Sequence, residues 1–337
     1  MKAALDNPIY TVYAVSGSTK YNLTDVLVDI RLSDHEKQLA QCATITVMNA
    51  KVGGSWLSSI LRVRSRIFIY ANDGKRNDEV FRGFVWTRGY KSALEERDIT
   101  IKCYDILMYF QESDDTEYFS EGKTSQDIIS KFCSKWGVSV DYSYDDITHS
   151  KLALRGNLAD IFTADVLDLV KDRTGKEYLI RAEKDVMKIM GYGQNPTVYT
   201  FAAKQNATLV KSEETMDGMV TKVVIIGKAD DKSDREPVEA TISGDTGQYG
   251  TLQEVLIRDE NTDLDEAKKE AQGILKKDGA PKWEYEVKAV DVPWIRKGDK
   301  VRVNAGDIAN QTLIVASVDH NISNSAKEIT MTLKKEV

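Results

Sequence analysis

The chain has 337 residues, of which 42% are hydrophobic and 29% charged, and its formal net charge is −7. That length accommodates two or three domains. The acidic balance argues against specific nucleic-acid binding, because a protein that neutralises phosphates needs a clustered basic face. No apolar stretch reaches the roughly 20 residues that a membrane span needs, and residues 1–10 lack the apolar core of a signal peptide. We therefore expect neither membrane insertion nor export by the chain itself.

The cysteines give no metal or disulfide signature. Their number is odd and no two are spaced as a CxxC pair, so the sequence predicts neither a disulfide framework nor a zinc site. Free cysteines often serve as small buried hydrophobic residues in a reducing cytosol. We expect that role for Cys42, Cys103 and Cys133.

The first 110 or so residues are typical of β-structure. Short runs alternate apolar and polar residues with a period of two, and Asn72-Asp73-Gly74 is a hairpin signal. One apolar interruption, residues 52–61, tolerates a helix. The predicted strands cover residues 10–13, 26–30, 43–48, 66–70, 79–86 and 98–104. Six short strands at even spacing favour a compact β-barrel or sandwich.

Three arginines, Arg62, Arg64 and Arg66, recur with a period of two. On a strand they would share one face. That face could be merely solvated, or it could meet an anion or another subunit.

The middle of the chain changes to a mixed pattern. Thr124 with Asp127 three residues later is close to a capping box. The apolar residues that follow have helical spacing, and Gly137 stands where a helix would end. A second helix is predicted over residues 158–171, with Gly175 at its end. A hairpin over residues 178–180 and 186–190 completes a small α/β module.

Strands return from residue 196 onward. An apolar run covers residues 220–226, charged residues 228–239 predict an exposed loop, and residues 244–250 predict another. A helix is expected from Thr262 or Asp263 to residue 277. Residues 290–333 then predict three short strands around the turn Lys297-Gly298-Asp299.

These elements predict an α+β, mainly β fold in which two small β-barrel or sandwich domains flank a small α/β module. The expected domains are residues 1–111, 112–195 and 196–337. No tandem repeat of 20–50 residues is visible. We nevertheless expect the region before Phe110 to be a structural counterpart of the closing segment, residues 290–333.

Motifs for enzyme chemistry are incomplete. Gly122-Lys123-Thr124 lacks the earlier glycine of a P-loop, since that position is Glu117. A calcium-loop pattern from Asp259 to Glu270 has a leucine where the loop needs glycine. The three histidines lie far apart, which excludes local zinc signatures. A glycosidase-like carboxylate pair stays open. The sequence thus predicts no catalytic residue, cofactor or metal ligand.

Four motifs in chain order carry a family resemblance. VFRGFVWTRGY at residues 80–90 precedes ITIKCYDILMYF at 99–110, and GKTSQDIISKFCSKWGV spans 122–138. A Tyr-Gly turn then precedes a helix with alanines four residues apart, and WIRKGDKVRV leads to LIVASVDHNIS. This order resembles the XkdQ/YqbQ-like baseplate hub proteins of contractile phage tails, related to late control protein D and the hub region of VgrG. The structural motif positions are Gly83, Tyr104, Asp105, Tyr249, Gly250, Gly298, Asp299 and Val301.

Two features depart from the family pattern. Arg296-Lys297 replaces the usual proline before the closing turn, and the chain ends at Val337 without a spike or lysozyme-like extension. We therefore expect a hub alone, with the spike and any wall hydrolase on other chains.

The resemblance implies a non-enzymatic structural protein. Such hubs form homotrimers whose paired domains make a pseudo-sixfold ring between a hexameric tail tube and a trimeric spike. The implied partners are the tail spike protein, the tail tube or tube-initiator protein, baseplate wedge proteins and a tape-measure protein. The protein would belong to the virion of a phage, or to a tail-like bacteriocin, and would assemble in the bacterial cytoplasm. The alternative is a tail-associated protein that binds or hydrolyses the cell wall.

Overall fold

The computed structural model describes residues 8–92, 97–203, 205–227, 236–258, 262–306 and 308–335. The chain forms two compact units. Unit 1 consists of Met1–Lys211 and Tyr285–Val337, and unit 2 of Ser212–Glu284. The boundaries fall inside two strands, β16 (Ala207–Thr215) and β20 (Lys282–Val290).

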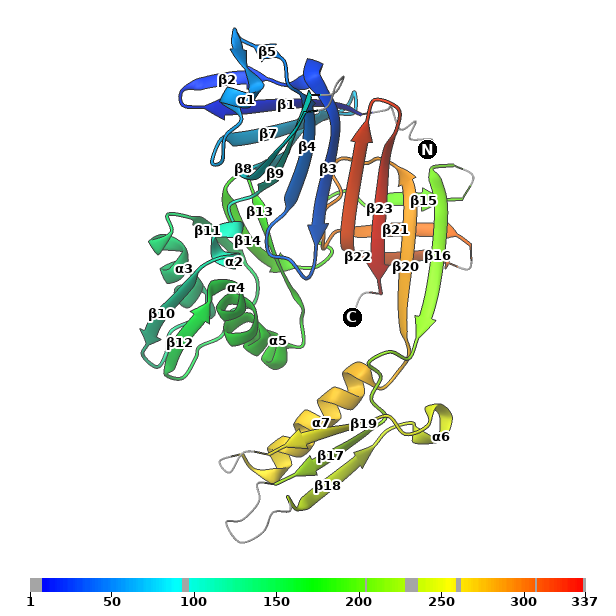
Figure 1. Cartoon of the computed structure of the whole chain (residues 1–337). Coiled ribbons are helices and arrows are strands. Elements are labelled where there is room, and N and C mark those ends of the chain that lie inside the picture. The colour runs from blue at the N-terminus through cyan, green and yellow to red at the C-terminus, as the bar shows by residue number, and fades with distance from the viewer. Residues whose placement is uncertain are drawn as a thin grey trace. The chain divides into compact units, whose positions relative to one another are not determined.

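One large sheet organises unit 1 (Figure 1). Among the described residues it has 13 strands, in the order β16-β20-β23-β22-β3-β4-β9-β8-β7-β1-β2, with β21 beside β22 and β15 beside β21. The mainly β class expected from the sequence is confirmed. Besides β16 and β20, the strands are β1 (Ile9–Ser16), β2 (Thr19–Asn22), β3 (Leu27–His35), β4 (Cys42–Met48), β7 (Arg66–Asn72), β8 (Asn77–Ser92), β9 (Arg97–Tyr104), β15 (Tyr199–Ala202), β21 (Lys300–Ala305), β22 (Ile308–Ser323) and β23 (Lys327–Lys334).

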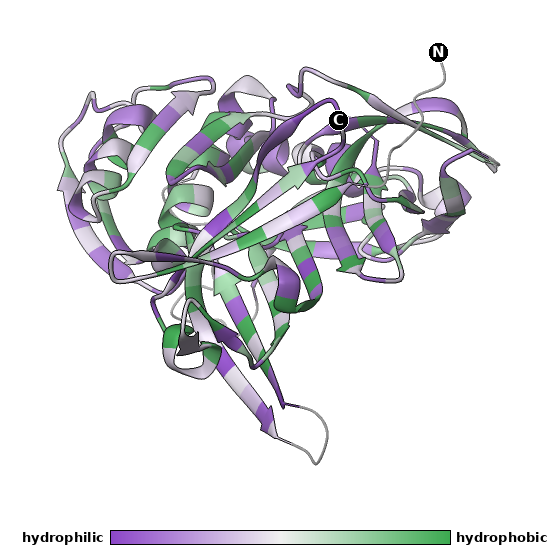
Figure 2. Cartoon of the chain, turned by 90° about the horizontal axis from the view of Figure 1, so that it is seen from above, coloured by the Kyte–Doolittle hydropathy of each residue, from purple (hydrophilic) through white to green (hydrophobic). Residues whose placement is uncertain are grey.

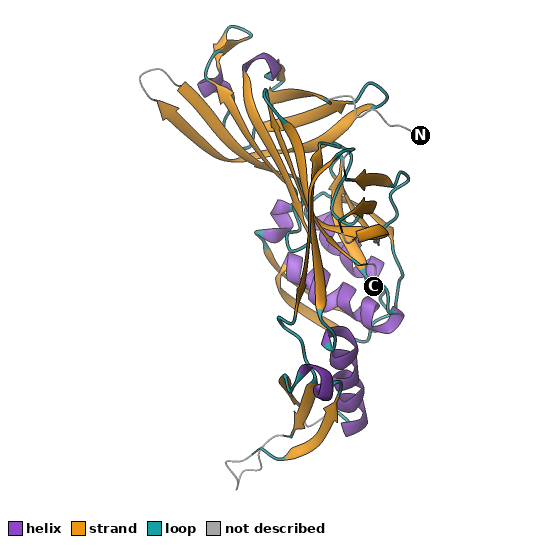
Figure 3. Cartoon of the chain, turned by 90° about the vertical axis from the view of Figure 1, so that its right-hand side faces the viewer, coloured by secondary structure: helices purple, strands orange, loops and turns teal. Residues whose placement is uncertain are grey.

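The sheet joins the two ends of the chain. Strand β3, near the N-terminus, pairs antiparallel with β22, near the C-terminus, so that Ile30 lies opposite Ile322. Figure 1 shows β3 and β22 side by side, and Figure 3 shows the long strands of unit 1 in orange.

Strands β7, β8 and β9 have the same pairing as β21, β22 and β23. Both β8 and β22 contain 16 residues. The first half of each pairs with the preceding strand and the second half with the following one. Phe84 lies opposite Tyr104 in the first set, as Ile314 lies opposite Lys334 in the second. The closing segment thus has its expected counterpart before Phe110.

The irregularities match as well. The β8–β9 ladder has a bulge between Val85 and Thr87, and the β22–β23 ladder has one between Val315 and Ser317. On both sides of this bulge, each residue of β22 or β23 has a number 230 higher than its equivalent in β8 or β9. Strand β4 then pairs with β9 as β20 pairs with β23, and β3 lies next to β4 as β16 lies next to β20. The sheet therefore contains the strand group β16-β20-β23-β22 followed by the equivalent group β3-β4-β9-β8.

Period-two alternation gives the sheet one buried face. Alternate residues of β3 and β4, such as Ile30, Leu32 and Ile45, are at most 1% exposed and belong to one core cluster. Figure 2 shows the same alternation of hydrophobic and hydrophilic residues along the strands. Burial of this face is the main stabilising contribution expected for such a sheet.

The segment before β7 differs from its prediction. Residues 52–61 contain only a four-residue helix, α1 (Leu57–Ile60), after the short strands β5 (Lys51–Val52) and β6 (Ser55–Trp56). The prediction that three arginines share one strand face is wrong, because only Arg66 lies in β7. Arg62 and Arg64 lie in the preceding turn, where Arg64 has a left-handed φ of 69°. A short 3-10 helix (Thr24–Val26) precedes β3.

The α/β module of unit 1 follows its predicted signals. Helix α3 (Ser125–Lys135) begins with the expected capping box, in which the Asp127 amide donates to Thr124 Oγ1 at 3.2 Å and the Thr124 amide donates to the Asp127 carboxylate at 3.4 Å. Gly137 has a left-handed φ of 65° just after the helix. The other helices are α2 (Met108–Gln111), α4 (Leu158–Asp160) and α5 (Asp168–Thr174), and the strands are β10 (Asp114–Phe119), β11 (Ser139–Ser143), β12 (Leu152–Asn157), β13 (Tyr178–Glu183) and β14 (Val186–Gly191).

The second predicted helix contains an unexpected π-helical turn, η2 (Ile161–Leu167), between α4 and α5. It still buries the apolar side foreseen from the sequence, including Phe162 and Val166. Gly175 ends the helix with a φ of 71°. The residues around this helix form a second core cluster, separate from the cluster of the strand group β3-β4-β9-β8.

Unit 2 is a three-stranded sheet with one long helix. The strand order is β18 (Val238–Ser243), β17 (Lys222–Ile226) and β19 (Gln253–Ile257). Helix α7 (Leu264–Asp278) contributes Ala267 and Ala271 to the core of this unit. The predicted loop 244–250 contains a short helix, α6 (Thr246–Tyr249). Residues 228–235 of the predicted charged loop lie outside the described residues, and its last residues begin β18.

Candidate functional site

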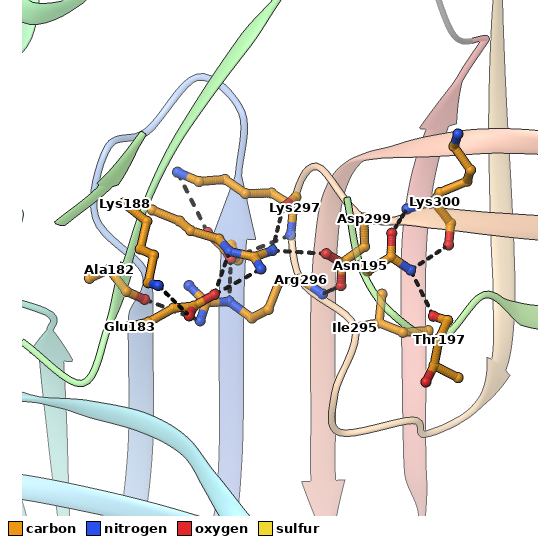
Figure 4. A network of polar contacts seen from close by, with 12 residues as sticks. Ala182, Glu183, Lys188, Asn195, Thr197, Ile295, Arg296, Lys297, Asp299 and Lys300 are labelled. Carbon is orange, nitrogen blue, oxygen red and sulfur yellow. Dashed lines mark hydrogen bonds and ion pairs between the residues drawn. The ribbon is translucent and has the colours of Figure 1, made fainter. Parts of the chain in front are cut away.

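The closing turn carries a cluster of buried charges. Arg296, Lys297 and Asp299 precede β21, and Figure 4 shows their side chains on the turn between Ile295 and Lys300. Lys297 is 2% exposed and Asp299 is 6% exposed. Charged side chains are rarely so deeply buried unless they are paired. Their partners come from strands distant in the sequence.

Asp34 of β3 is the main partner of the turn's cations. Its carboxylate accepts a hydrogen bond from Arg296 Nε at 2.5 Å and lies 3.6 Å from Lys297 Nζ. Burial alone would raise the pKa of Asp34, but Arg296 and Lys297 outweigh it and hold that pKa below its usual value. This contact ties the closing turn to the strand group β3-β4-β9-β8.

Lys297 also forms hydrogen bonds to the loop between β3 and β4. Its ammonium donates to the carbonyl oxygens of Gln38 at 2.5 Å and Leu39 at 3.0 Å. Burial lowers the pKa of Lys297, and the negative charge of Asp34 opposes that shift. The lysine therefore supplies a donor to two loop carbonyls and a second positive charge to Asp34, which already accepts from Arg296.

Arg181 of β13 joins the α/β module to the same turn. Its guanidinium donates to the Asp299 carboxylate at 2.8 Å, and both side chains are largely buried. The other Asp299 oxygen accepts from the Arg296 amide at 3.0 Å. Burial raises the pKa of Asp299, although Arg181 opposes the rise. One turn thus connects β3, the α/β module and the closing strands.

Asp105, a predicted motif position, lies beside this cluster at the end of β9. It is 4% exposed and accepts from the backbone amides of Gln41 and Leu107, each at 2.9 Å. Burial raises the pKa of Asp105 to about 6. The carboxylate holds the turn after β9 against the start of β4.

The glycines of the motif allow close approach of the backbone. A Cβ on Gly83 would lie 2.2 Å from the Tyr104 carbonyl oxygen, on the neighbouring strand. Gly298 has a φ of 81°, and a Cβ there would lie 2.2 Å from Leu179 of β13. Only glycine fits either position without displacing a neighbour. Tyr104 itself packs edge-on against Trp86, with ring centroids 6.3 Å apart.

The remaining motif positions divide between the two units. Val301 is fully buried in β21, where it lies opposite Leu313. Tyr249 and Gly250 lie in unit 2, at the end of α6. The Gly250 carbonyl accepts from the Thr221 hydroxyl at 2.7 Å. The structure thus brings Asp105 and Gly298-Asp299 into one region of unit 1, whereas the Tyr-Gly turn belongs to another unit.

Asn195 supports the same turn from the other side. Its side chain accepts from the Lys300 amide at 2.6 Å and donates to the carbonyl oxygens of Lys300 and Thr197 at 2.9 and 2.7 Å (Figure 4). The segment that follows the α/β module is therefore fixed to the first residue of β21.

Four members of this cluster were not among the motif positions predicted from the sequence: Asp34, Arg181, Arg296 and Lys297. Two signals could have found them. Asp34 shares its alternation with the buried Ile30 and Leu32, so a carboxylate stands on the buried face of β3. Arg296 and Lys297 also place two cations directly before the Gly298-Asp299 turn. A buried carboxylate needs a cation, and this pair supplies two.

A second buried network ties the N-terminal strand to the closing segment. The Tyr10 hydroxyl donates to Asp291, and His320 Nδ1 lies 2.7 Å from the same carboxylate. His320 Nε2 lies 3.0 Å from the Ile295 carbonyl oxygen. Both ring nitrogens thus lie beside oxygen atoms, Nδ1 beside the Asp291 carboxylate and Nε2 beside a backbone carbonyl.

Both networks serve to join strands. The cluster has three carboxylates and three cations: Asp34, Asp105, Asp299, Arg181, Arg296 and Lys297. Within the described ranges, no group of three or more histidine, cysteine or acidic side chains could hold a metal ion. In that same part of the chain, no helix is long and apolar enough to cross a bilayer.

Solved structures share this fold at low sequence identity. A tail protein from Neisseria meningitidis MC58 aligns with a TM-score of 0.72 and 12% identity, covering 97% of each chain. The 43 kDa tail protein of prophage MuSo2 from Shewanella oneidensis gives 0.71 and 12%, covering 96% of this chain and 98% of its own. The E. coli c3393 protein, a component of the type VI secretion system, gives 0.58 and 8%, covering 93% and 74%.

No curated protein matches the chain in sequence. The model of the YQBQ-like family, in contrast, matches residues 32–334. That match includes both strand groups except the first residues of β3, and it includes the α/β module, the buried cluster and unit 2. The chain therefore belongs to the YQBQ-like family.

Proposed function

We propose that this protein is a structural baseplate hub of a contractile phage tail or a tail-like bacteriocin. In this role three copies form a ring that adapts a hexameric tail tube to a trimeric spike. The supporting observation is the duplication within the large sheet, where β16-β20-β23-β22 stands beside the equivalent group β3-β4-β9-β8. Each copy thus offers two similar strand groups side by side.

Such a duplication suits a change of symmetry. Three copies with two similar groups each would present six similar positions to a sixfold tube, while the whole ring keeps the threefold symmetry of a spike. A heterologous contact that closes after three copies generates this arrangement. Residues 1–111 and 196–337 would supply the two ring domains, and residues 112–195 the module between them.

The buried cluster supports the same role. A hub under mechanical load needs its two strand groups held in a fixed relation, and Asp34 with Arg296 and Lys297 joins them directly. The structural neighbours are described as tail proteins or as a secretion-system component. The proposed partners are therefore the spike, the tube or tube initiator, the wedge proteins and a tape-measure protein, in a particle assembled in the bacterial cytoplasm.

The oligomeric state tests this proposal. Mass photometry and negative-stain imaging of the full chain, alone and with its cognate spike, should give a particle of three copies with a central opening. A strictly monomeric chain under both conditions would contradict the ring. Turbidity of cell-wall suspensions tests the alternative of wall hydrolysis, and here no clearing is expected.

A further inference from the structure

One exposed loop of unit 1 carries cations that neither buried network uses. This basic loop, residues 49–65, connects β4 to β7 and contains β5, β6 and α1 (Figure 1). The surrounding segment, residues 37–72, contains five basic residues and no acidic one, although the whole chain has a net charge of −7. Lys51, Arg62 and Arg64 of the basic loop are exposed. The loop therefore presents a local positive charge on an acidic protein.

The two arginines of the basic loop differ from the arginine that follows them. Arg66, at the start of β7, pairs with Asp185 at 2.5 Å. The guanidinium groups of Arg62 and Arg64 form neither an ion pair nor a hydrogen bond with the residues that the structure describes. A cation that serves the fold has a partner within the fold, as Arg66 has. The charges of the other two are available to an anion from another molecule.

The backbone at Arg64 has a conformation that suits glycine. Its φ of 69° lies in the left-handed region, which residues with a Cβ rarely adopt. Two hydrogen bonds hold the turn against β8. The Arg64 amide donates to the Val85 carbonyl at 2.8 Å, and the Val85 amide donates to the Ser65 carbonyl at 2.9 Å. An arginine in this strained and fixed position indicates that its side chain has a use outside the fold.

Exposed apolar side chains accompany the cations. Val63, between the two arginines, is 60% exposed, and Trp56 is 46% exposed. Lys51 Nζ lies 5.6 Å from the centre of the Trp56 ring. Helix α1 joins Trp56 to the arginine turn, and its buried residues Leu57 and Ile60 anchor the loop in the core of the sheet. The basic loop thus offers apolar and positive groups together on an ordered base.

We propose that the basic loop binds an acidic segment of another protein of the tail particle. Arginine and tryptophan often carry much of the binding energy in protein–protein contacts, and a positive surface selects a negative one. A polypeptide fits better than a nucleic acid, because an acidic chain repels a polyanion and because phosphate binding needs a larger basic face. This inference rests on the proposed hub function and gives one of its contacts a surface and a chemistry.

Photocross-linking of the full chain tests this contact. Val63 is replaced by the photoreactive residue p-benzoylphenylalanine. The chain is then mixed in turn with its cognate tube, tube initiator, spike, wedge and tape-measure proteins, and with a short DNA duplex. We expect a cross-link to one of these proteins, at a segment in which mass spectrometry finds more Asp and Glu than Lys and Arg. The same replacement of Tyr118 in β10, which is 62% exposed, is the matched control and should give no cross-link to that segment.

Charge reversal tests the role of the arginines. Arg62→Glu combined with Arg64→Glu should weaken binding of the cross-linked protein by about tenfold or more, because two attractions become repulsions. Biolayer interferometry measures this affinity. The difference from the wild type should shrink as the salt concentration rises, since salt screens exposed charges.

Arg64→Gly separates binding from folding. Glycine adopts the left-handed backbone without strain, so the melting temperature should stay the same or rise. Binding should nevertheless weaken by about threefold or more, because one charge is lost. A lower melting temperature with unchanged binding would show that Arg64 serves the fold instead.

The remaining outcomes separate this surface from the hub function. Cross-links from Val63 to DNA alone, to a second copy of this chain alone, or to a segment without excess negative charge would overturn the acidic partner. Equal cross-linking from Tyr118, or full affinity of the double arginine variant, would do the same. A trimer that gives no cross-link from Val63 would overturn the surface and leave the hub function standing. A chain that stays monomeric with its spike, yet cross-links to an acidic segment, would overturn the ring and support the surface.

Discussion

Lys297 shows how one side chain can hold several segments of this fold together. Its ammonium contacts the Asp34 carboxylate and the carbonyl oxygens of Gln38 and Leu39, in a place with almost no solvent. The cost of removing these charges from water is offset only while all the partners are present. The cluster therefore depends on each of its members.

Replacing Lys297 with methionine should destabilise the protein by about 3 kcal/mol, because it leaves Asp34 with one cation and two loop carbonyls without a donor. Chemical denaturation measures this free energy of unfolding. Lys37→Met is the matched control, since Lys37 lies exposed in the same loop, and it should change stability by less than about 0.5 kcal/mol. Equal effects of the two substitutions would contradict the role assigned to Lys297.

Asp105 should make stability depend on pH. Its folded pKa of about 6 lies above the value of about 3.9 for an unfolded chain. Between these values the folded state binds more protons, so the contribution of Asp105 to stability is present at low pH and is lost as pH rises through about 6. The full effect is of the order of 2–3 kcal/mol.

In the variant Asp105→Asn, the side chain at position 105 has no carboxyl group to titrate in this pH range. Unfolding free energies at pH 4.5 and 7.5 should therefore fall more steeply with rising pH in the wild type than in this variant. Parallel slopes for the two proteins would show that Asp105 does not titrate in this range.

At the scale of elements, the close contact between β8 and β9 depends on Gly83. The side chain of alanine at this position would meet the Tyr104 carbonyl at 2.2 Å and the Phe81 ring at 2.7 Å. Gly83→Ala should therefore cost about 2 kcal/mol or more, because backbone must move. Thermal denaturation with a two-state fit measures the loss.

Gly89 lies on the same strand and offers the control. A Cβ there would meet only the Thr100 carbonyl, at 3.7 Å. Gly89→Ala should be neutral, or slightly stabilising because alanine loses less chain entropy on folding. A large loss of stability in Gly89→Ala together with a small loss in Gly83→Ala would contradict the close contact assigned to Gly83.

Elements with strong local signals were predictable from the sequence. Thr124 and Asp127 marked the start of α3, and Gly137 and Gly175 marked helix ends, because capping and left-handed residues act over a single turn. The π-helical turn at Ile161–Leu167 was missed, since nothing local distinguishes it from an α-helical turn. The arginine stripe was wrong because period two was assumed to continue through a turn.

At the scale of the whole molecule, unit 2 should be dispensable for the folding of unit 1. Its core cluster contains Val223, Ile225 and Ala271, all from the Ser212–Glu284 segment. Replacing residues 213–283 with an Asn-Gly turn between β16 and β20 should leave a folded unit 1, because those strands are neighbours and the turn suits an antiparallel hairpin. Circular dichroism and thermal unfolding of the shortened chain test this.

The same deletion bears on assembly. The two strand groups of the large sheet lie in unit 1, apart from the ends of β16 and β20, so the shortened chain should still form trimers by mass photometry. Aggregation or loss of cooperative unfolding would show that unit 1 needs unit 2.

The sequence alone determined the mainly β class, the α/β interruption and most individual strands and helices, because these follow from periodicity, capping and turn residues that lie within a few positions of one another. It also carried the family motifs, including Gly83 and Gly298-Asp299. Only the tertiary structure decided that Asp34, Arg181 and Lys297 meet, and that β8 repeats the pairing of β22. Those relations join residues more than a hundred positions apart, and their geometry depends on how the strands order themselves in one sheet.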